Sequence, residues 1–231
     1  MKTEKIVGIL GGMGPEATVE LMRRIVVATP AQVDNDHIHC IVDQNSKVPN
    51  RVLSIQGKIA SAGPVLADMA RRLEQFGADM LCMPCNTAHY YLPEIQAASS
   101  LPFVDMLEAT AKHIHATRPQ ATSAAVLCTV GTRSTGLYEQ RLGALGIQAV
   151  YPDAMLQEEV SAIIAAVKAG DSSPAMRQRF LAVIDAMRAQ GVPVMIAACT
   201  ELSVICPSDE AVVDALDCLV AELVRRVKAP R

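Results

Sequence analysis

The chain has 231 residues, of which 51% are apolar, and its 21 basic and 24 acidic residues give a formal net charge of −3. The length lies between one ordinary domain and two, and the apolar share suffices for a large core without disulfides or a structural metal. The balanced charge and the lack of a dense Lys/Arg run argue against a nucleic-acid partner. Three Phe, four Tyr and no Trp argue against a base-stacking or sugar-binding platform.

Seven cysteines are spread along the chain: Cys40, Cys82, Cys85, Cys128, Cys199, Cys206 and Cys218. An odd number does not fit the disulfide framework of a small secreted protein. The polar N-terminus runs directly into a short apolar strand, which fits no signal peptide, and no apolar stretch approaches the ~20 residues of a membrane span. We therefore expect a reduced, soluble, cytoplasmic protein with no membrane partner, whose thiols are free to pack or to react.

The first half of the chain alternates short apolar runs, typical of buried strands, with longer amphipathic segments, typical of helices. Pro15 and Gly77 mark helix ends, because proline is favoured at the first helical position and glycine just after the last. Strands are predicted at residues 6–10, 39–42, 80–83 and 102–104, and helices from Pro15 onward, over 61–76 and after 87.

The same alternation restarts after Pro119. Strands are predicted at residues 124–127, 147–151 and 194–196, and helices at 135–145, 154–169, 174–190 and 209–228. Strands separated by helices throughout are typical of parallel sheets in an α/β fold.

The two halves also share a spacing of residues. Each half has a Gly-x-x-x-Thr segment after its first strand and a glycine eight residues before a cysteine: Gly14-x-x-x-Thr18, Gly77 and Cys85 in the first, and Gly131-x-x-x-Thr135, Gly191 and Cys199 in the second. This predicts two similar parallel-sheet α/β domains related by pseudo-duplication. Each would place one cysteine at the carboxyl end of a strand, which is where such sheets bind their ligands.

Two such domains packed face to face would bring Cys85 and Cys199 to opposite sides of one cleft. A thiol, with its ordinary pKa of about 8.5, can both accept and release a proton near neutral pH. The pair therefore suits removal of a proton from one side of a carbon atom and return of a proton to the other. Asn86, Thr87 and Thr200 add hydrogen-bond donors beside the two sulfur atoms.

Five segments together resemble the aspartate/glutamate racemase family, in order and over nearly the whole chain. They are Gly11-Gly12-Met13-Gly14-Pro15-Glu16-Ala17-Thr18, Val48-Pro49-Asn50-Arg51, Met83-Pro84-Cys85-Asn86-Thr87-Ala88-His89, Gly131-Thr132-Arg133-Ser134-Thr135 and Ala198-Cys199-Thr200-Glu201-Leu202. The resemblance, nearest to the aspartate racemase branch, implies racemisation of an amino acid by two bases without pyridoxal phosphate or any other cofactor. It also implies a homodimer whose active site lies between two α/β domains, 1–105 with 206–231, and 106–205. The last helix would return to the first domain.

Carried over position by position, the resemblance makes Cys85 and Cys199 the two catalytic bases, with Cys199 acting on the L enantiomer and Cys85 on the D. The expected substrate-binding residues are Met13 and Thr132 lining the cleft, Asn86, Thr87 and Ala88 beside the α-carboxylate, Arg51 flanked by Asn50 and Val52 on the side-chain carboxylate, Lys168 as a second cation, and Thr200 beside the second sulfur. A guanidinium binds a carboxylate through two parallel hydrogen bonds, which suits Arg51 to an acidic substrate.

One residue departs from the family pattern. Asn50 stands before the arginine, where an acidic residue is common in this branch. The expected reaction is therefore racemisation of an acidic amino acid, with aspartate first and with glutamate or a broader substrate range left open.

The glycine-rich segment allows an alternative function. Gly12-x-Gly14-x-x-Ala17 after a strand matches the dinucleotide fingerprint, with Asp43 as the ribose-binding acid, so an NAD(P)-dependent oxidoreductase remains open. Against it, Asp43 lies about thirty residues beyond the loop instead of ~20, and the paired cysteines have no part in that chemistry. A related maleate isomerase, which also uses two cysteines, is a further alternative.

Other polar and thiol groups have simpler interpretations. Cys82-x-x-Cys85-x-x-x-His89 has the spacing of half a zinc site or a redox pair, but Cys82 should point away from Cys85 on its strand. Apart from Cys85 and Cys199, the cysteines are expected to be packing residues. His89 could orient the Cys85 loop, and Glu201 could hold a nearby donor or favour the start of its helix.

Overall fold

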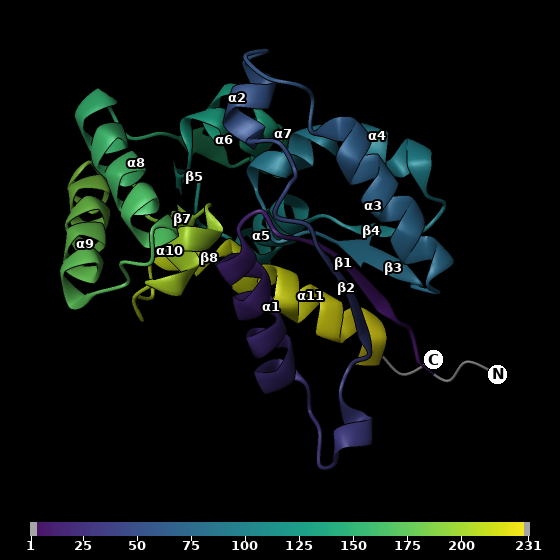
Figure 1. Cartoon of the computed structure of the whole chain (residues 1–231). Coiled ribbons are helices and arrows are strands. Elements are labelled where there is room, and N and C mark those ends of the chain that lie inside the picture. Colours follow the sequence, from purple (N-terminus) through teal and green to yellow (C-terminus); the bar gives the residue numbers. More distant parts are fainter. Residues whose placement is uncertain (1–3, 229–231) are drawn as a thin grey trace. The chain divides into compact units, whose positions relative to one another are not determined.

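The computed structural model describes residues 4–228, which form two compact units (Figure 1). The first unit contains the residues up to Met106 and those from Leu219 onward, and the second contains Leu107–Cys218. Both boundaries fall inside helices, α5 (Met106–Thr117) and α11 (Ala215–Lys228). Within the described residues, no helix is both long enough and apolar enough to cross a membrane.

The first unit is built on a four-stranded parallel sheet with the order β2-β1-β3-β4. Its strands are β1 (Val7–Gly11), β2 (Cys40–Gln44), β3 (Met80–Cys82) and β4 (Phe103–Val104), and its helices and 3₁₀ turns are α1 (Pro15–Ala28), η1 (Asp34–Asp36), α2 (Arg51–Ile55), α3 (Gly63–Gln75), η2 (Thr87–Tyr91) and α4 (Leu92–Ala98). Helices α3 and α4 lie together on one side of this sheet and α1 on the other (Figure 1).

One part of the core of the first unit lies between its sheet and the helices α3 and α4. Leu10 of β1 and Leu81 of β3 pack against an apolar stripe on α3 and against Ile95 of α4. The stripe consists of Leu66, Met69, Ala70 and Leu73, which recur at helical spacing and are all buried. Burial of this stripe holds α3, which connects β2 to β3 in the sequence, against the sheet. The chain then returns to the sheet as β3 and continues to Cys85.

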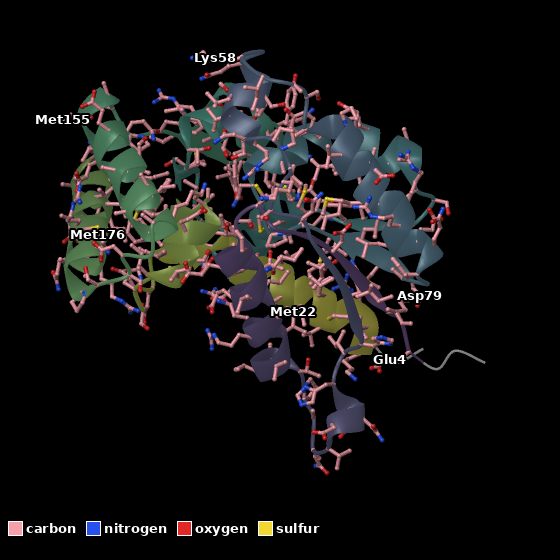
Figure 2. The ribbon with its side chains drawn as sticks, viewed as in Figure 1. Glu4, Met22, Lys58, Asp79, Met155 and Met176 are labelled. Carbon is pink, nitrogen blue, oxygen red and sulfur yellow. The ribbon has the colours of Figure 1, made fainter. Side chains whose placement is uncertain are left out.

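Polar contacts fasten the ends of the first unit. Asp79, labelled in Figure 2 just before β3, accepts a hydrogen bond at Oδ2 from the backbone N–H of Ile6, 2.8 Å away, and so aligns β1 with β3. Glu4, also labelled in Figure 2, pairs with Lys228 at the end of α11, and the Lys228 ammonium also donates to the Asp36 carbonyl. Residues 219–228 are thus held within the first unit.

The second unit repeats the architecture with the order β6-β5-β7-β8, again entirely parallel. Its strands are β5 (Ser123–Leu127), β6 (Gln148–Val150), β7 (Met195–Ala197) and β8 (Val212–Asp214), and its helices are α6 (Val130–Ser134), α7 (Leu137–Gly143), α8 (Ala154–Lys168), α9 (Pro174–Ala189) and α10 (Thr200–Val204). Phe180, Ile184 and Met187 of α9 form one core with Val160 and Ile163 of α8 and with β5 and β7. Helices α8 and α9 lie side by side (Figure 1).

The predicted fold class is confirmed, because both units are parallel-sheet α/β structures with the same strand order. The predicted helix over 209–228 is wrong at its start. Residues Val212–Asp214 form β8, which pairs with β7, and the helix begins only at Ala215. Two adjacent valines favour a strand there. The second unit therefore extends to Cys218.

The loop after β1 depends on Gly12, and replacement of this residue should destabilise the protein. Its φ is +90°, and a Cβ atom there would lie 2.3 Å from the backbone carbonyl carbon of Asn45, which cannot move aside as a side chain could. We expect Gly12→Ala to lower the free energy of unfolding by about 2–3 kcal/mol, measured by urea denaturation. Gly143→Ala is the control. Gly143 is the last residue of α7 and has open space around it, so this variant should keep the free energy of unfolding of the wild type. Equal stability of Gly12→Ala and the wild type would contradict this prediction.

Candidate functional site

Cys85 lies at the carboxyl end of β3, one of the two central strands of the first sheet. Met83 and Pro84 separate it from the last strand residue, Cys82, and η2 begins two residues later. The thiol is free and its residue is 7% exposed. The short segment between strand and helix thus holds the sulfur at the end of the sheet, largely shielded from water.

His89 fixes the backbone of Cys85. Its Nδ1 lies 2.8 Å from the carbonyl oxygen of Cys85, and its Nε2 accepts the backbone N–H of Met106 at 3.2 Å. Because Nε2 accepts, the proton of the neutral ring belongs on Nδ1, which donates to Cys85. The buried ring also packs edge-on against Phe103 of β4, with centroids 5.8 Å apart. His89 is thus part of the support of Cys85.

This arrangement does not fit the zinc half-site considered for Cys82, Cys85 and His89. Both imidazole nitrogens already have protein partners, and Cys82 is completely buried in the strand. Over residues 4–228, no group of three or more Cys, His, Asp or Glu side chains could hold a metal ion.

The residues predicted beside Cys85 are buried with it. Asn86 caps η2, and Thr87 and Ala88 form its first turn, all three shielded from solvent. Met13, in the loop after β1, belongs to the same apolar cluster as Cys85 and Ala88. The structure therefore places Met13 in the surroundings of the Cys85 loop.

Arg51 is the first residue of α2, and its guanidinium is only partly used within the protein. Asn50 caps this helix, accepting the backbone N–H of Leu53 on Oδ1 at 3.2 Å. The Nη1 atom of Arg51 donates to the carbonyls of Val48 and Pro49, each at 3.1 Å. Within residues 4–228, Arg51 has no carboxylate partner, and its Nε and Nη2 have no hydrogen-bond acceptor. The guanidinium therefore keeps hydrogen-bond donors that the described protein does not use.

A buried hydroxyl pair connects α2 to the Cys85 segment. Ser54, on α2 with Arg51 and Val52, shares a hydrogen bond with the Tyr91 hydroxyl at the end of η2. The Ser54 oxygen also accepts the backbone N–H of Ala62 at 2.9 Å. Sequence spacing gave no sign of this contact, which fixes Arg51 relative to η2.

Cys199 occupies the equivalent position in the second unit. It follows β7 by two residues, caps α10, and is 7% exposed, as is Cys85. Its Sγ donates to Oε2 of Glu201 at 2.9 Å, and the other carboxylate oxygen of Glu201 lies 3.3 Å from Nζ of Lys168. Three residues from two helices and a strand end are thus joined in one chain of polar contacts.

Two predicted threonines also lie at this end of the second sheet. Thr200 is the first residue of α10 and is buried. Thr132 is buried in α6, after β5, where its N–H donates to Thr129 Oγ1 at 3.1 Å. Since β5 and β7 are neighbouring parallel strands, both hydroxyl-bearing segments follow the same sheet edge.

Several other thiols are unsuited to act as bases. Burial raises the pKa of Cys40 to about 11, those of Cys128 and Cys218 to about 12, and that of Cys82 well above its usual value. These four thiols stay protonated near neutral pH.

The acid expected to bind a ribose is already engaged. Oδ2 of Asp43, at the end of β2, lies 2.7 Å from Nη2 of Arg72 on α3. Gly12, in the glycine-rich loop, instead donates its N–H to Thr18 Oγ1 at 2.9 Å. These contacts do not favour the dinucleotide alternative.

Residues 10–223 match the family model of the Asp/Glu/hydantoin racemases. The chain belongs to this family. The racemase is 28% identical over 228 residues to the broad specificity amino-acid racemase RacX of Bacillus subtilis (strain 168), covering 95% of this chain and 96% of RacX.

Solved structures of racemases share its fold. The Picrophilus torridus aspartate racemase superposes with a TM-score of 0.85 at 30% identity, over 96% of this chain and 94% of that one. Glutamate racemase isoform RacE1 from Bacillus anthracis has a TM-score of 0.69 at 18% identity, over 99% and 83% of the two chains, and its likeness concerns the fold alone.

Proposed function

We propose that this racemase interconverts the enantiomers of an acidic amino acid, with aspartate as its first substrate, and that Cys85 and Cys199 are its two bases. One observation carries the proposal. Two sheets of identical strand order each place one buried cysteine just beyond the equivalent central strand, β3 or β7. A repeated thiol serves a reaction that needs a proton acceptor on one side of a carbon and a donor on the other.

The difficulty of the reaction explains the groups around the two sulfurs. The α-proton of an amino acid is very weakly acidic, and in this proposal no pyridoxal phosphate takes up the charge left behind. Hydrogen-bond donors fixed in a water-poor site must then stabilise charge developing on the carboxylate. Asn86 and Thr87 beside Cys85, and Thr132 and Thr200 in the other unit, take this part in the proposal, and they are buried.

The remaining residues orient the substrate in this proposal. Met13 and Ala88 supply apolar walls, and α2, with Asn50 as its cap and Val52 in its first turn, presents Arg51 to the side-chain carboxylate. Lys168 supplies a second positive charge. Cys199 acts on the L enantiomer and Cys85 on the D, as the family resemblance implies. The cleft between the domains and the homodimer belong to the same proposal.

The substrate assignment is supported by two relatives with different names. The Picrophilus torridus protein is an aspartate racemase, whereas RacX is a broad specificity amino-acid racemase. Arg51, with no carboxylate partner in the described residues, favours an acidic substrate. Aspartate is therefore proposed first, with glutamate and other amino acids as the range to be measured.

Solvent deuterium incorporation tests both the reaction and the substrate. The protein is incubated in D₂O with L-aspartate, D-aspartate, L-glutamate or L-alanine, and loss of the α-proton signal is followed by NMR. We expect exchange from both enantiomers of aspartate without added cofactor. A parallel sample with maleate tests the related isomerisation. Absence of exchange in every amino acid would contradict the proposed function.

A further inference from the structure

The carboxylate of Glu201 bridges a thiol and an ammonium group. Cys199 Sγ donates to Oε2 at 2.9 Å, and Lys168 Nζ lies 3.3 Å from Oε1. Glu201 is 8% exposed, whereas the Lys168 side chain is 50% exposed. These contacts with a thiol and an ammonium group indicate that the buried carboxylate has a role beyond favouring the start of the five-residue helix α10.

We propose that Glu201 is a positioning residue that keeps the Cys199 thiol protonated and directed, and that Lys168 adjusts this equilibrium through Glu201. The inference deepens the proposed function and rests on it for its meaning in catalysis. The contacts from which it is argued all lie inside the second unit.

Three effects on the protonation of Cys199 have known signs. A hydrogen bond from S–H to a carboxylate stabilises the thiol, and the negative charge of Glu201 disfavours a thiolate beside it. The Lys168 ammonium offsets part of that charge and so acts in the opposite direction. Glu201 and Lys168 therefore shift the protonation of Cys199 in opposite senses.

The two cysteines differ in this respect. The second residue after Cys199 is Glu201, whereas the second residue after Cys85 is the uncharged Thr87. In a two-base mechanism, one cysteine must hold the proton that the other lacks. The asymmetry assigns this proton to Cys199 in the resting pair. When Cys199 then acts as the acid, its S–H bond breaks, the proton goes to the substrate α-carbon, and sulfur keeps the bonding pair.

Three other acidic residues near α10 have other partners or face solvent. On α8, Glu159 pairs with Arg179 of α9 at 2.6 Å, and Glu158 is exposed. Asp214 of β8 accepts the hydroxyl of Ser203 at 2.6 Å. At the end of β5, burial holds the pKa of the Cys128 thiol near 12, so it is uncharged. Glu201, and Lys168 through it, are charged groups whose contacts lead directly to the sulfur of Cys199.

The test measures the protonation of Cys199 without substrate. The full-length protein is alkylated with iodoacetamide over a pH series, and mass spectrometry gives the rate for the Cys199 peptide. We expect Glu201→Gln to move the midpoint of the rate profile down by about one pH unit, and Lys168→Met to move it up. Glu158 is an exposed carboxylate on the same unit, and Glu158→Gln should leave the Cys199 midpoint unchanged. None of the three substitutions should move the midpoint for the Cys85 peptide.

Opposite shifts support the proposal, and a purely structural role of Glu201 would not produce them. An unmoved profile in folded Glu201→Gln, or shifts of the same sign in both variants, overturns it. If Glu201→Gln fails to fold, the alkylation profile of Lys168→Met tests the inference by itself, because Lys168 is half exposed. An unmoved or lowered midpoint in Lys168→Met then refutes the inference. Since alkylation needs no turnover, this outcome is independent of the deuterium exchange that tests the proposed function.

Discussion

Replacement of either Cys85 or Cys199 by serine is expected to abolish racemisation, with a fall in kcat on the order of 10³-fold or more. A hydroxyl is far less acidic than a thiol, so near neutral pH serine supplies neither the base nor an acid of matched strength. Each variant keeps the shape of its site, because serine differs from cysteine in one atom. Loss of activity can therefore be assigned to proton transfer.

The measurement is the rate at which optical rotation or circular dichroism of aspartate decays, started separately from each enantiomer. Cys40→Ser in the first unit and Cys206→Ser in the second are matched controls, since both thiols are half-buried and neither is assigned a role in catalysis. Both should racemise aspartate as the wild type does. A mechanism with a single cysteine base would leave one of the two site variants active, and wild-type turnover by either Cys85→Ser or Cys199→Ser would refute the two-base assignment.

Much of the fold could be predicted because apolar runs and amphipathic helices differ in period. The long helices α8 and α9 begin at Ala154 and Pro174, as predicted, and end within a residue of the predicted positions. Short elements carry too few residues for a period to emerge. The five-residue helices α2 and α6 were therefore not predicted, and α10 was expected only as the start of a helix at Glu201, without an end. The three-residue β8 was assigned to the helix that follows it.

The candidate site also has one part that the sequence could predict and one part that it could not. Cys85 and Cys199 were accessible from sequence because each follows a buried strand and precedes polar residues, a local pattern. The contact of Lys168 with Glu201 and that of Ser54 with Tyr91 join segments distant in sequence. Such contacts depend on how helices pack on the sheet, which residue spacing does not encode. The role of Glu201 could be inferred only after its two partners were known.

Substrate preference should depend most strongly on Arg51. We expect Arg51→Met to lower kcat/KM for aspartate by about 10²–10³-fold, since removal of one partner of a largely desolvated ion pair costs about 3–4 kcal/mol. Arg51→Lys should recover only part of the loss, because an ammonium cannot reproduce the two parallel hydrogen bonds of a guanidinium.

The structural part played by Arg51 makes a second substrate necessary. Its Nη1 atom supports the carbonyls of Val48 and Pro49 before α2, so Arg51→Met also removes two hydrogen bonds within the protein. Alanine has no side-chain carboxylate for Arg51 to bind. Where the wild type exchanges the α-proton of alanine, the rate of that exchange should therefore fall far less in Arg51→Met. Arg71→Met, a half-exposed arginine of α3 in the same unit, controls for lost positive charge and should leave both rates unchanged. An equal loss for aspartate and alanine would mean that Arg51 supports the loop before α2 and does not select the substrate.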